Sequence, residues 1–432
     1  MDAIAQKIIT QIDANRDTLI AFAKAIAAEA EPGFYEEHTA QKVTDFLKSC
    51  GLTPQTGLAR TGVKAVFGTK KPCVCIVAEL DGVACPTHPQ ANPANGLAHA
   101  CGHHLQLTAL AGAALALTNP AVAQALDGSV AFFAVPAEEY VRLETQAAVA
   151  KSDGIRFCCG KSELLRIHAF SDIDIALTTH VHMIETQADL LLGNNACNGF
   201  LCKSVVFHGK AAHAATAPHL GVNALNAAAL SLSAIGMLRE TFREKDSVRI
   251  HTNILHGGDA LNVVPDTVAL EAQLRAANLT ALHSVSAAFD RACNGCAAAL
   301  GAVAEIETHQ GYMPVLPCAA HPASIAAADA IGENLNVLHA DLSVQNMAST
   351  DVGDLTQVMP VINFTHSGVA GALHSAEFHV TDDEKAYLIP AKMMALQAYE
   401  LLKNNAACAK KTIADFTPAL TLDAYIKQIE EA

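Results

Sequence analysis

The chain has 432 residues, more than one hydrophobic core usually supports, so we expect two domains. Hydrophobic residues make up 51% and charged residues 16%, which is typical of a globular protein and excludes a largely disordered one. The formal net charge of −15 disfavours nucleic acid as a partner, because phosphate-backbone binding usually needs a basic face.

The N-terminal residues 1–13 have the spacing of an amphipathic helix and lack the apolar run of a signal peptide. No segment reaches the roughly 18 uninterrupted apolar residues of a membrane span, so we expect no membrane association. The 13 cysteines are scattered and odd in number, which favours a reducing compartment over a disulfide framework. These features together predict a cytoplasmic protein.

The first half of the chain predicts an α/β fold. Three almost continuously apolar runs, at residues 73–80, 129–135 and 173–179, are typical of strands buried on both faces of a mainly parallel sheet. An Ala- and Leu-rich helix is expected at residues 105–117, between the first two strands. This alternation of strands and helices predicts a sheet flanked by helices.

From residue 196 the pattern changes to that of a second, inserted domain. The expected elements are a strand at 200–208, a helix at 220–239, strands at 247–256 and 263–274, a helix at 279–300 and a strand at 302–308. This β-α-β-β-α-β order is the ferredoxin-like plan. We therefore expect an α+β domain at 196–310, inserted into a domain formed by 1–195 and 311–432.

The C-terminal part returns to the α/β pattern. The segment from Thr381 to Glu384 predicts a capping box at the start of a long helix. Beyond residue 405 we expect an additional strand or helix.

The chemistry centres on His99-Ala-Cys101-Gly-His103-His104, which precedes the helix at 105–117. A cysteine and a histidine two residues apart at a loop-to-helix turn can bind one cation. By itself this pattern is weak, since a packed cysteine and a surface histidine are more common. It needs further ligands.

Such ligands stand at the ends of the next two expected strands. One strand ends in Pro136-Ala-Glu138-Glu139 and the other in Thr179-His180-Val-His182, and the carboxyl ends of parallel strands meet at one edge of a sheet. Adjacent glutamates are usually a solvated pair, but at this edge one carboxylate can bind a metal while its neighbour accepts a proton from metal-bound water. Farther along, His374 would be an ordinary loop histidine if it stood alone.

Taken together, these motifs resemble the aminoacylase and carboxypeptidase-G-type metallopeptidase superfamily. The similar branch holds hippurate, indole-acetyl-amino-acid and aminobenzoyl-glutamate hydrolases. The resemblance covers about residues 15–402. It rests on seven ordered motifs: Ala78-Glu-Leu-Asp81, His-Ala-Cys-Gly-His, Pro-Ala-Glu-Glu, Gly209-Lys-Ala-Ala-His213, Gly257-Gly through Asn262 to Pro265, Gly311-Tyr-Met-Pro314 and Leu373-His374-Ser375.

The resemblance implies a hydrolase with two divalent metal ions, drawn from zinc, manganese, cobalt or nickel. Glu138 would be the general base for a metal-bridged water. Asp81 would not bind a metal itself but would contact the residues that do. The implied ligands are Cys101 as the bridge, His103, Glu139, His180 and His374.

The resemblance also gives the inserted domain a role as a lid and dimerisation domain. His213 would polarise the scissile carbonyl, often in the partner subunit's site, while Asn262 and Arg275 would hold the oxyanion and the substrate carboxylate. A homodimer acting on a small N-acyl or N-aroyl amino acid, similar to aminobenzoyl-glutamate, is therefore expected.

Two other functions stay open: a dipeptidase of the same superfamily and a catalytically silent binding or scaffold protein. The chain departs from the family pattern at His104, where Asp or Asn is usual, and in an insertion at residues 141–160.

Overall fold

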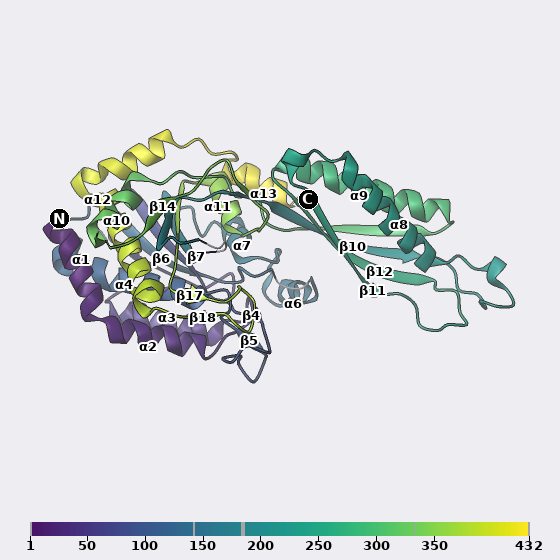
Figure 1. Ribbon diagram of the computed structural model, residues 1–432, viewed down its shortest axis with the longest axis horizontal. Helices are drawn as coiled ribbons and strands as arrows, with labels where there is room; N and C mark the ends of the chain where they lie inside the picture. The colour runs from purple at the N-terminus through teal and green to yellow at the C-terminus, as the bar shows by residue number, and fades with distance from the viewer. Residues whose placement is uncertain (1, 141–142, 183–185, 333, 431–432) are drawn as a thin grey trace. The chain divides into compact units, whose positions relative to one another are not determined.

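The computed structural model describes residues 2–140, 143–182, 186–332 and 334–430 (Figure 1). Its contacts divide the chain into two compact units. Unit 1 comprises Met1–Asn195, Leu316–Val344 and Asp354–Ile426; unit 2 comprises Ala196–Val315, Gln345–Gly353 and Lys427–Ala432.

The segment Gln345–Gly353 groups with unit 2 although it is far from Ala196–Val315 in the sequence. The cause is backbone pairing. Strand β15 (Gln345–Asn346) pairs in parallel with β9 (Ala196–Cys197), and the Asn198 amide donates to the carbonyls of Asn346 and Ala348, at 3.1 Å each. These long-range bonds cannot be read from local pattern.

Unit 1 contains an eight-stranded sheet. Its strands, in spatial order, are β1 (Gln55–Leu58), β2 (Gly62–Phe67), β6 (Ser129–Val135), β3 (Cys73–Glu79), β7 (Ile175–Val181), β16 (Val361–His366), β8 (Leu190–Leu192) and β14 (Val337–His339). The sheet is mixed, and its central part is parallel as expected. Its four central strands run parallel, whereas β2 and β8 run antiparallel to β6 and β16.

The central strands were predicted well because they are buried on both faces. Every residue of β3 and of β6 is buried, as their continuous apolar sequences indicate. Helix α4 (His103–Leu117) is buried along almost its whole surface, which is typical of a helix that is apolar all round. It packs against α12 (Ile389–Asp415), so the core of unit 1 lies around α4.

The predicted C-terminal helix is present, but its cap differs from the expected one. The Asp382 carboxylate accepts hydrogen bonds from the amides of Glu384 and Lys385, at 2.9 and 3.1 Å, so Asp382 rather than Thr381 satisfies the first free N–H groups. Beyond residue 405 the chain forms two helical segments: the end of α12, which follows a break in the helical backbone at Lys403–Ala406, and α13 (Leu422–Glu430); residues 416–421 between them are not helical.

Unit 2 has the predicted ferredoxin-like order. Its sheet runs β11 (Arg249–His256), β12 (Thr267–Ala276), β10 (Gly199–His208) and β13 (Val303–Gln310), all antiparallel. Helices α8 (Ala224–Leu238) and α9 (Leu279–Ala299) pack on one face through residues such as Val285 and Phe289. The burial of β12 alternates strictly, so one face of the sheet is covered by helices and the other is open.

Within the described residues, no helix is both long and apolar enough to cross a membrane.

Two helical glycines should respond in opposite ways to alanine. A Cβ on Gly112 in α4 would lie 2.7 Å from the Cβ of Ala391, whereas a Cβ on Gly236 in α8 would meet no atom within 4 Å. Overpacking costs about 1–3 kcal/mol, more than the roughly 1 kcal/mol that alanine gains over glycine in a helix. We expect Gly112→Ala to lower the melting temperature by roughly 2 °C or more and Gly236→Ala to leave it equal or higher, as measured by calorimetry. A more stable Gly112→Ala protein would contradict this packing.

Candidate metal centre

The candidate residues of unit 1 gather at one edge of its sheet because three neighbouring strands end there. Strands β3, β6 and β7 are parallel, so their carboxyl ends meet at the same edge. Asp81 follows β3, Glu138 and Glu139 follow β6, and His180 is the second-last residue of β7. The parallel arrangement of β3, β6 and β7 thus brings the residues that follow β3 and β6 close to His180 at the end of β7.

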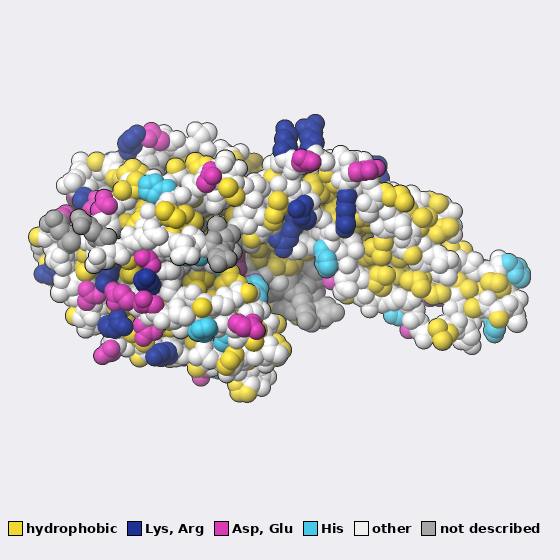
Figure 2. All heavy atoms as spheres, in the orientation of Figure 1, with side chains coloured by type: hydrophobic (Ala, Val, Ile, Leu, Met, Phe, Trp, Pro, Cys, Tyr) yellow, Lys and Arg dark blue, Asp and Glu magenta, His cyan; other side chains and the backbone are white. Residues whose placement is uncertain are grey.

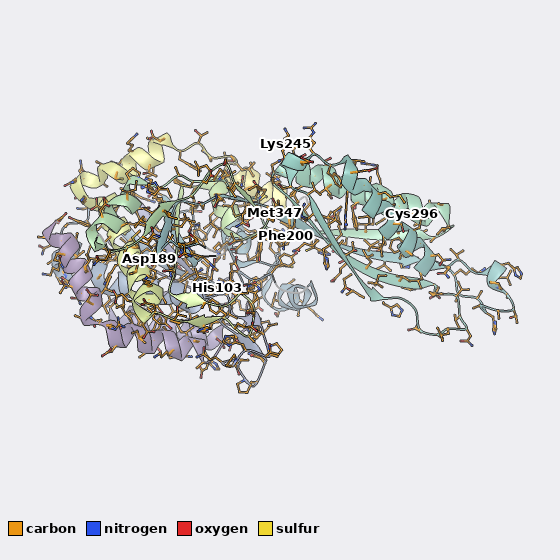
Figure 3. The ribbon with its side chains drawn as sticks, in the orientation of Figure 1. His103, Asp189, Phe200, Lys245, Cys296 and Met347 are labelled. Atoms are coloured by element: carbon orange, nitrogen blue, oxygen red, sulfur yellow. The ribbon has the colours of Figure 1, made fainter. Side chains whose placement is uncertain are left out.

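The Cys-Gly-His motif reaches this edge from the start of α4, where His103 is the first helical residue (Figure 3). Gly102 has a φ of 91°, which favours glycine, and a Cβ there would lie 3.3 Å from a methyl group of Val181. The glycine therefore lets Cys101 and His103 turn toward the same point beside β7.

The structure brings all five expected ligands together in two groups. The ligand atoms of Cys101, His103 and His180 lie within 4.8 Å of one another, and so do those of Cys101, Glu139 and His374. The Cys101 Sγ lies 3.4 Å from His180 Nε2, and Glu139 Oε1 lies 3.0 Å from His374 Nε2. Cys101 belongs to both groups, so it could serve as a ligand in each.

Hydrogen bonds from Nδ1 to backbone carbonyls fix the orientation of two imidazole rings. His103 Nδ1 donates to the Asp81 carbonyl at 2.9 Å, and His180 Nδ1 donates to the Val181 carbonyl at 3.0 Å. In each ring this leaves Nε2 directed at the cluster. Burial also lowers the pKa of His180, which favours the neutral form that binds metal.

Two observations test whether a pair of divalent ions fits. His103 Nε2 and Glu139 Oε1 are buried, and among the described residues neither makes a hydrogen bond of good geometry, although Glu79 and His374 lie 3.2 and 3.0 Å from them. Burial raises the pKa of the Cys101 thiol well above its usual value, and a bound cation would restore the thiolate. The mixed sulfur, nitrogen and oxygen donors fit borderline divalent metals.

The expected general base lies beside these groups. Glu138 is buried, with Oε2 at 3.8 Å from His103 Nε2. Asp81 is completely buried; its Oδ2 accepts a hydrogen bond from the Glu139 amide at 2.8 Å, and its Oδ1 lies 3.2 Å from His103 Nδ1. One carboxylate therefore supports a ligand from each group.

A buried charge pair beneath His103 was not predicted. Glu79 Oε2 lies 3.2 Å from His103 Nε2 and accepts a hydrogen bond from Gln106, while the fully buried Lys161 donates to Glu79 Oε1 at 2.6 Å. Burial would raise the pKa of Glu79, but Lys161 and His103 hold it at about 2. Glu79 lies within the Ala78-Glu-Leu-Asp81 motif, but only Asp81 was given a role there. Lys161 directly follows the insertion and carried no sequence signal.

Glu36 was also missed, and it holds the loop that presents the base. Its Oε1 accepts a hydrogen bond from the Ala137 amide at 2.7 Å, while the Gly160 amide donates to the Ala137 carbonyl at 2.9 Å. Ala137 has a φ of 48°, an unfavourable conformation for a residue with a Cβ. Glu36 and Asp81 thus fix alternate amides, at residues 137 and 139, on either side of Glu138.

The insertion itself is described from residue 143; residues 141 and 142 lie outside the described residues. It forms α6 (Leu143–Asp153), after which Gly160 begins α7 (Gly160–Arg166). His104, the other departure, is buried next to His99, with ring centroids 5.6 Å apart, and burial lowers its pKa to about 3. Neither departure removes an expected ligand.

The expected lid residues all belong to unit 2 and fall into two places. His213 and Asn262 are neighbours, since the Ala214 amide donates to the Asn262 carbonyl at 2.9 Å and His213 bridges Val263. Arg275 is near the end of β12, eight residues beyond Thr267, or roughly 26 Å along the strand. Within one chain, therefore, a small molecule at Arg275 does not reach His213 or Asn262.

Arg275 is itself held in place. Its guanidinium donates to Gln273 Oε1, at 3.0 and 3.1 Å, and to Ser349 Oγ at 2.8 Å, and it lies 5.3 Å from the centre of the Phe200 ring. Ser349 belongs to the segment that joins unit 2 from outside the expected domain limits.

The Glu36 contact predicts a positioning role that can be separated from stability. Glu36→Ala should lower kcat for an N-aroyl amino acid by about 10- to 100-fold with little change in KM, because a displaced base reacts poorly in a bound complex. Glu36→Gln keeps an acceptor for the Ala137 amide and should recover most of the activity.

A matched control is Glu31, whose buried carboxylate accepts from the amides of His38 and Thr39 at the start of α3 (Glu37–Ser49). Glu31→Ala should lower thermal stability with kcat preserved. Wild-type kcat in the Glu36→Ala protein would disprove the positioning role.

The chain is similar to several known proteins. The peptidase dimerisation domain (M20_dimer) model matches residues 196–297. A p-aminobenzoyl-glutamate hydrolase subunit of Escherichia coli (strain K12) is 30% identical over 296 residues, which cover 66% of this chain and 56% of that relative. The Xaa-Arg dipeptidase of Mus musculus is 26% identical over 429 residues, covering 93% of this chain and 90% of the relative.

Solved structures share the fold. A dinuclear metal-binding peptidase of the M20 family from Bacillus subtilis superposes with a TM-score of 0.67 and 21% identity, over 90% of this chain and 99% of the other. An aminobenzoyl-glutamate utilization protein from Klebsiella pneumoniae gives a TM-score of 0.65 and 17% identity, over 90% and 97%. These matches support the resemblance to the M20 amidohydrolase branch that the motifs predicted.

Proposed function

We propose that this protein cleaves the amide bond of a small N-acyl or N-aroyl amino acid, of the aminobenzoyl-glutamate type. The observation that carries the proposal is the pair of ligand groups that share Cys101 next to the buried carboxylate of Glu138. Relatives named as aminobenzoyl-glutamate hydrolase subunits, at 30% identity, support this substrate type.

Cys101, His103 and His180 would hold one divalent ion, and Cys101, Glu139 and His374 the other. Two such ions act as Lewis acids and lower the pKa of a bound water toward about 7. Zinc, manganese, cobalt and nickel are all compatible with this donor set.

Glu138 would take the proton of the attacking water and deliver it to the leaving nitrogen. Glu36 and Asp81 would keep its loop in place through the amides of Ala137 and Glu139. Arg275 would bind the carboxylate next to the scissile amide, since a guanidinium forms two parallel bonds with a carboxylate.

His213 and Asn262 would act in the site of a second copy of the chain. Their distance along β12 from Arg275 supports this division of roles. A homodimer is further supported by exposed apolar side chains in unit 2, where Figure 2 shows many hydrophobic atoms at the surface: Met237, Ile254, Leu255, Leu261 and Val263. Two of these lie on β11, an edge strand whose free N–H and C=O groups can pair with another chain.

A dipeptidase is the second candidate, and it is favoured by the relative that aligns over nearly the whole chain, an Xaa-Arg dipeptidase. A catalytically silent protein is disfavoured because the base and all five ligand side chains are present and adjacent.

Replacing the base gives the most direct test. Glu138→Gln should reduce kcat by about 10²- to 10⁴-fold, because the amide cannot carry a proton, while two metal ions per chain remain by elemental analysis. Assays would use 4-aminobenzoyl-glutamate, hippurate and dipeptides with free amines. Activity within threefold of wild type would refute the base assignment, and a strong preference for free-amine dipeptides would favour the dipeptidase.

Mixed dimers test the role of His213. Inactive His213→Ala and inactive Glu138→Gln chains, unfolded and refolded together in equal amounts, should regain roughly a quarter of wild-type activity, because half of the dimers would be hybrids with one intact site of two. Each variant refolded alone is the control. If His213 served its own chain, every site in the mixture would carry a lesion and no activity would return.

A further inference from the structure

Glu79 belongs to a third group of potential metal ligands at the edge of the sheet in unit 1. The ligand atoms of Glu79, His103 and Glu138 lie within 4.8 Å of one another, and all three residues are buried. Glu79 Oε2 lies 3.2 Å from His103 Nε2, the nitrogen that faces the metal cluster. Carboxylate oxygens are common ligands of divalent metals, so a carboxylate in this position competes with the expected ligands unless another group holds it.

Two buried side chains hold the Glu79 carboxylate. The Lys161 ammonium, which has no exposed surface, donates to Oε1 at 2.6 Å, and Gln106 Nε2 donates to Oε2 at 2.8 Å. Gln106 Oε1 also accepts a hydrogen bond from the Glu79 amide at 3.0 Å, so the backbone and the side chain of Glu79 are both fixed. A carboxylate that a buried ammonium neutralises is a poor metal ligand, because an ion would first have to displace the lysine.

The backbone before Lys161 fixes the place of its ammonium. Lys161 is the second residue of α7, and the amide of Gly160, the first residue, donates to the Ala137 carbonyl at 2.9 Å. A Cβ on Gly160 would lie 1.7 Å from the Pro136 carbonyl oxygen, so this close approach requires glycine. The start of α7 is therefore packed against the loop that follows β6, and Lys161 extends from there to Glu79 at the end of β3.

We propose that Lys161 sets the metal preference of the centre by keeping Glu79 out of its donor set. An ion at Cys101, His103 and His180 then meets one sulfur and two nitrogen donors, which suit zinc better than manganese, whereas an added carboxylate oxygen would suit manganese. Lys161 is thus a residue that determines specificity without binding a metal itself. The inference rests on the ligand groups of the proposed function, but metal binding tests it without any substrate.

The experiment measures the preference for Zn²⁺ over Mn²⁺ in the substrate-free protein. Chelator-treated protein is titrated with each ion by calorimetry, Zn²⁺ in competition with a chelator of known affinity. Lys161→Met removes the charge and frees Glu79, so the preference for Zn²⁺ should fall by about tenfold or more, as one gained charge-assisted contact to Mn²⁺ implies. Adding Glu79→Gln should return the preference to within about threefold of wild type, because the two residues act as a pair.

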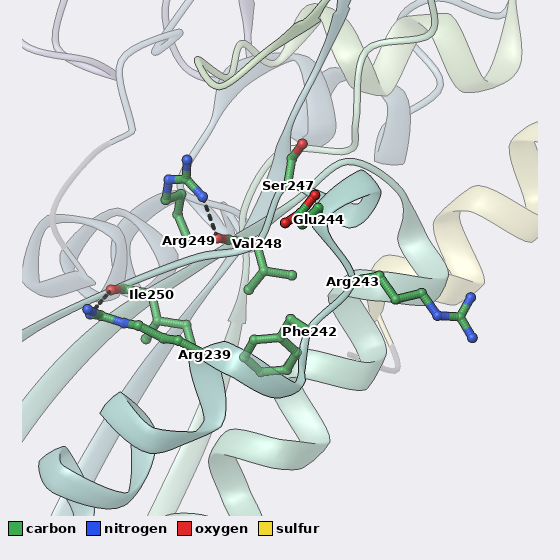
Figure 4. Close-up of a pocket in the computed structure, with 8 residues that line it drawn as sticks. All are labelled: Arg239, Phe242, Arg243, Glu244, Ser247, Val248, Arg249 and Ile250. Carbon is green, nitrogen blue, oxygen red and sulfur yellow. Dashed lines mark hydrogen bonds between the residues drawn. The ribbon is translucent and has the colours of Figure 1, made fainter.

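Unit 2 supplies two control variants, since all five expected ligands belong to unit 1. Lys203 is another buried lysine and donates to Asp290 and Thr308 at 2.9 and 2.7 Å, so Lys203→Met measures the effect of losing a buried lysine contact. Arg239 lines a hollow of about 450 Å³ and donates to the Ile250 carbonyl at 3.4 Å (Figure 4), so Arg239→Met measures the effect of one lost positive charge. Both variants should keep the wild-type preference.

The outcomes separate this inference from the proposed function. A wild-type protein that binds no divalent ion overturns both. An unchanged preference in Lys161→Met, or a change that Glu79→Gln does not reverse, overturns the role of Lys161 alone. If Lys161→Met does not fold, Glu79→Gln is compared with the double variant, which contains neither buried charge. The unpaired lysine should weaken the binding of both ions by about tenfold in Glu79→Gln, and equal affinities in these two variants would overturn the inference.

Discussion

The metal centre depends on one buried carboxylate, that of Asp81. It has no exposed surface, and its two oxygens serve different partners: Oδ2 accepts from the Glu139 amide and Oδ1 lies beside His103 Nδ1. A buried charge is stable only when its neighbours compensate for the lost water, so Asp81, His103 and the base loop hold one another in position. Both ligand groups are tied to this single residue at the end of β3.

Further buried ionisable groups surround Asp81 and extend the same principle. Lys161 neutralises Glu79 beneath His103, and Glu36, whose pKa burial and the Asp81 charge raise to about 8, fixes Ala137. Such groups cost folding free energy when unpaired, which explains why they are linked through Gly160 and Lys161 at the start of one short helix. The cost is offset by a rigid site whose ligands are in place before any ion binds.

In unit 2 the candidate functional residues do not converge on one point, as they do in unit 1. They lie at different places along a strand. The ten residues of β12 keep Arg275 and the His213–Asn262 pair at opposite ends of the same sheet. Strand β12 therefore keeps Arg275 and the His213–Asn262 pair apart. If the chain dimerises through its edge strand, Arg275 and this pair serve different active sites.

The sequence by itself determined the elements that have a strong local pattern. The continuous apolar runs located β3, β6 and β7, and the order of strands and helices in unit 2 located its ferredoxin-like sheet. The Cys-Gly-His and Glu-Glu motifs located candidate metal ligands. Only the tertiary structure decided what depends on contacts between distant residues. Glu36, Glu79 and Lys161 gain a role because folding brings residues up to about a hundred positions apart into contact in the buried interior. The same holds for the residues 345–353, whose place in unit 2 follows from backbone hydrogen bonds to Asn198.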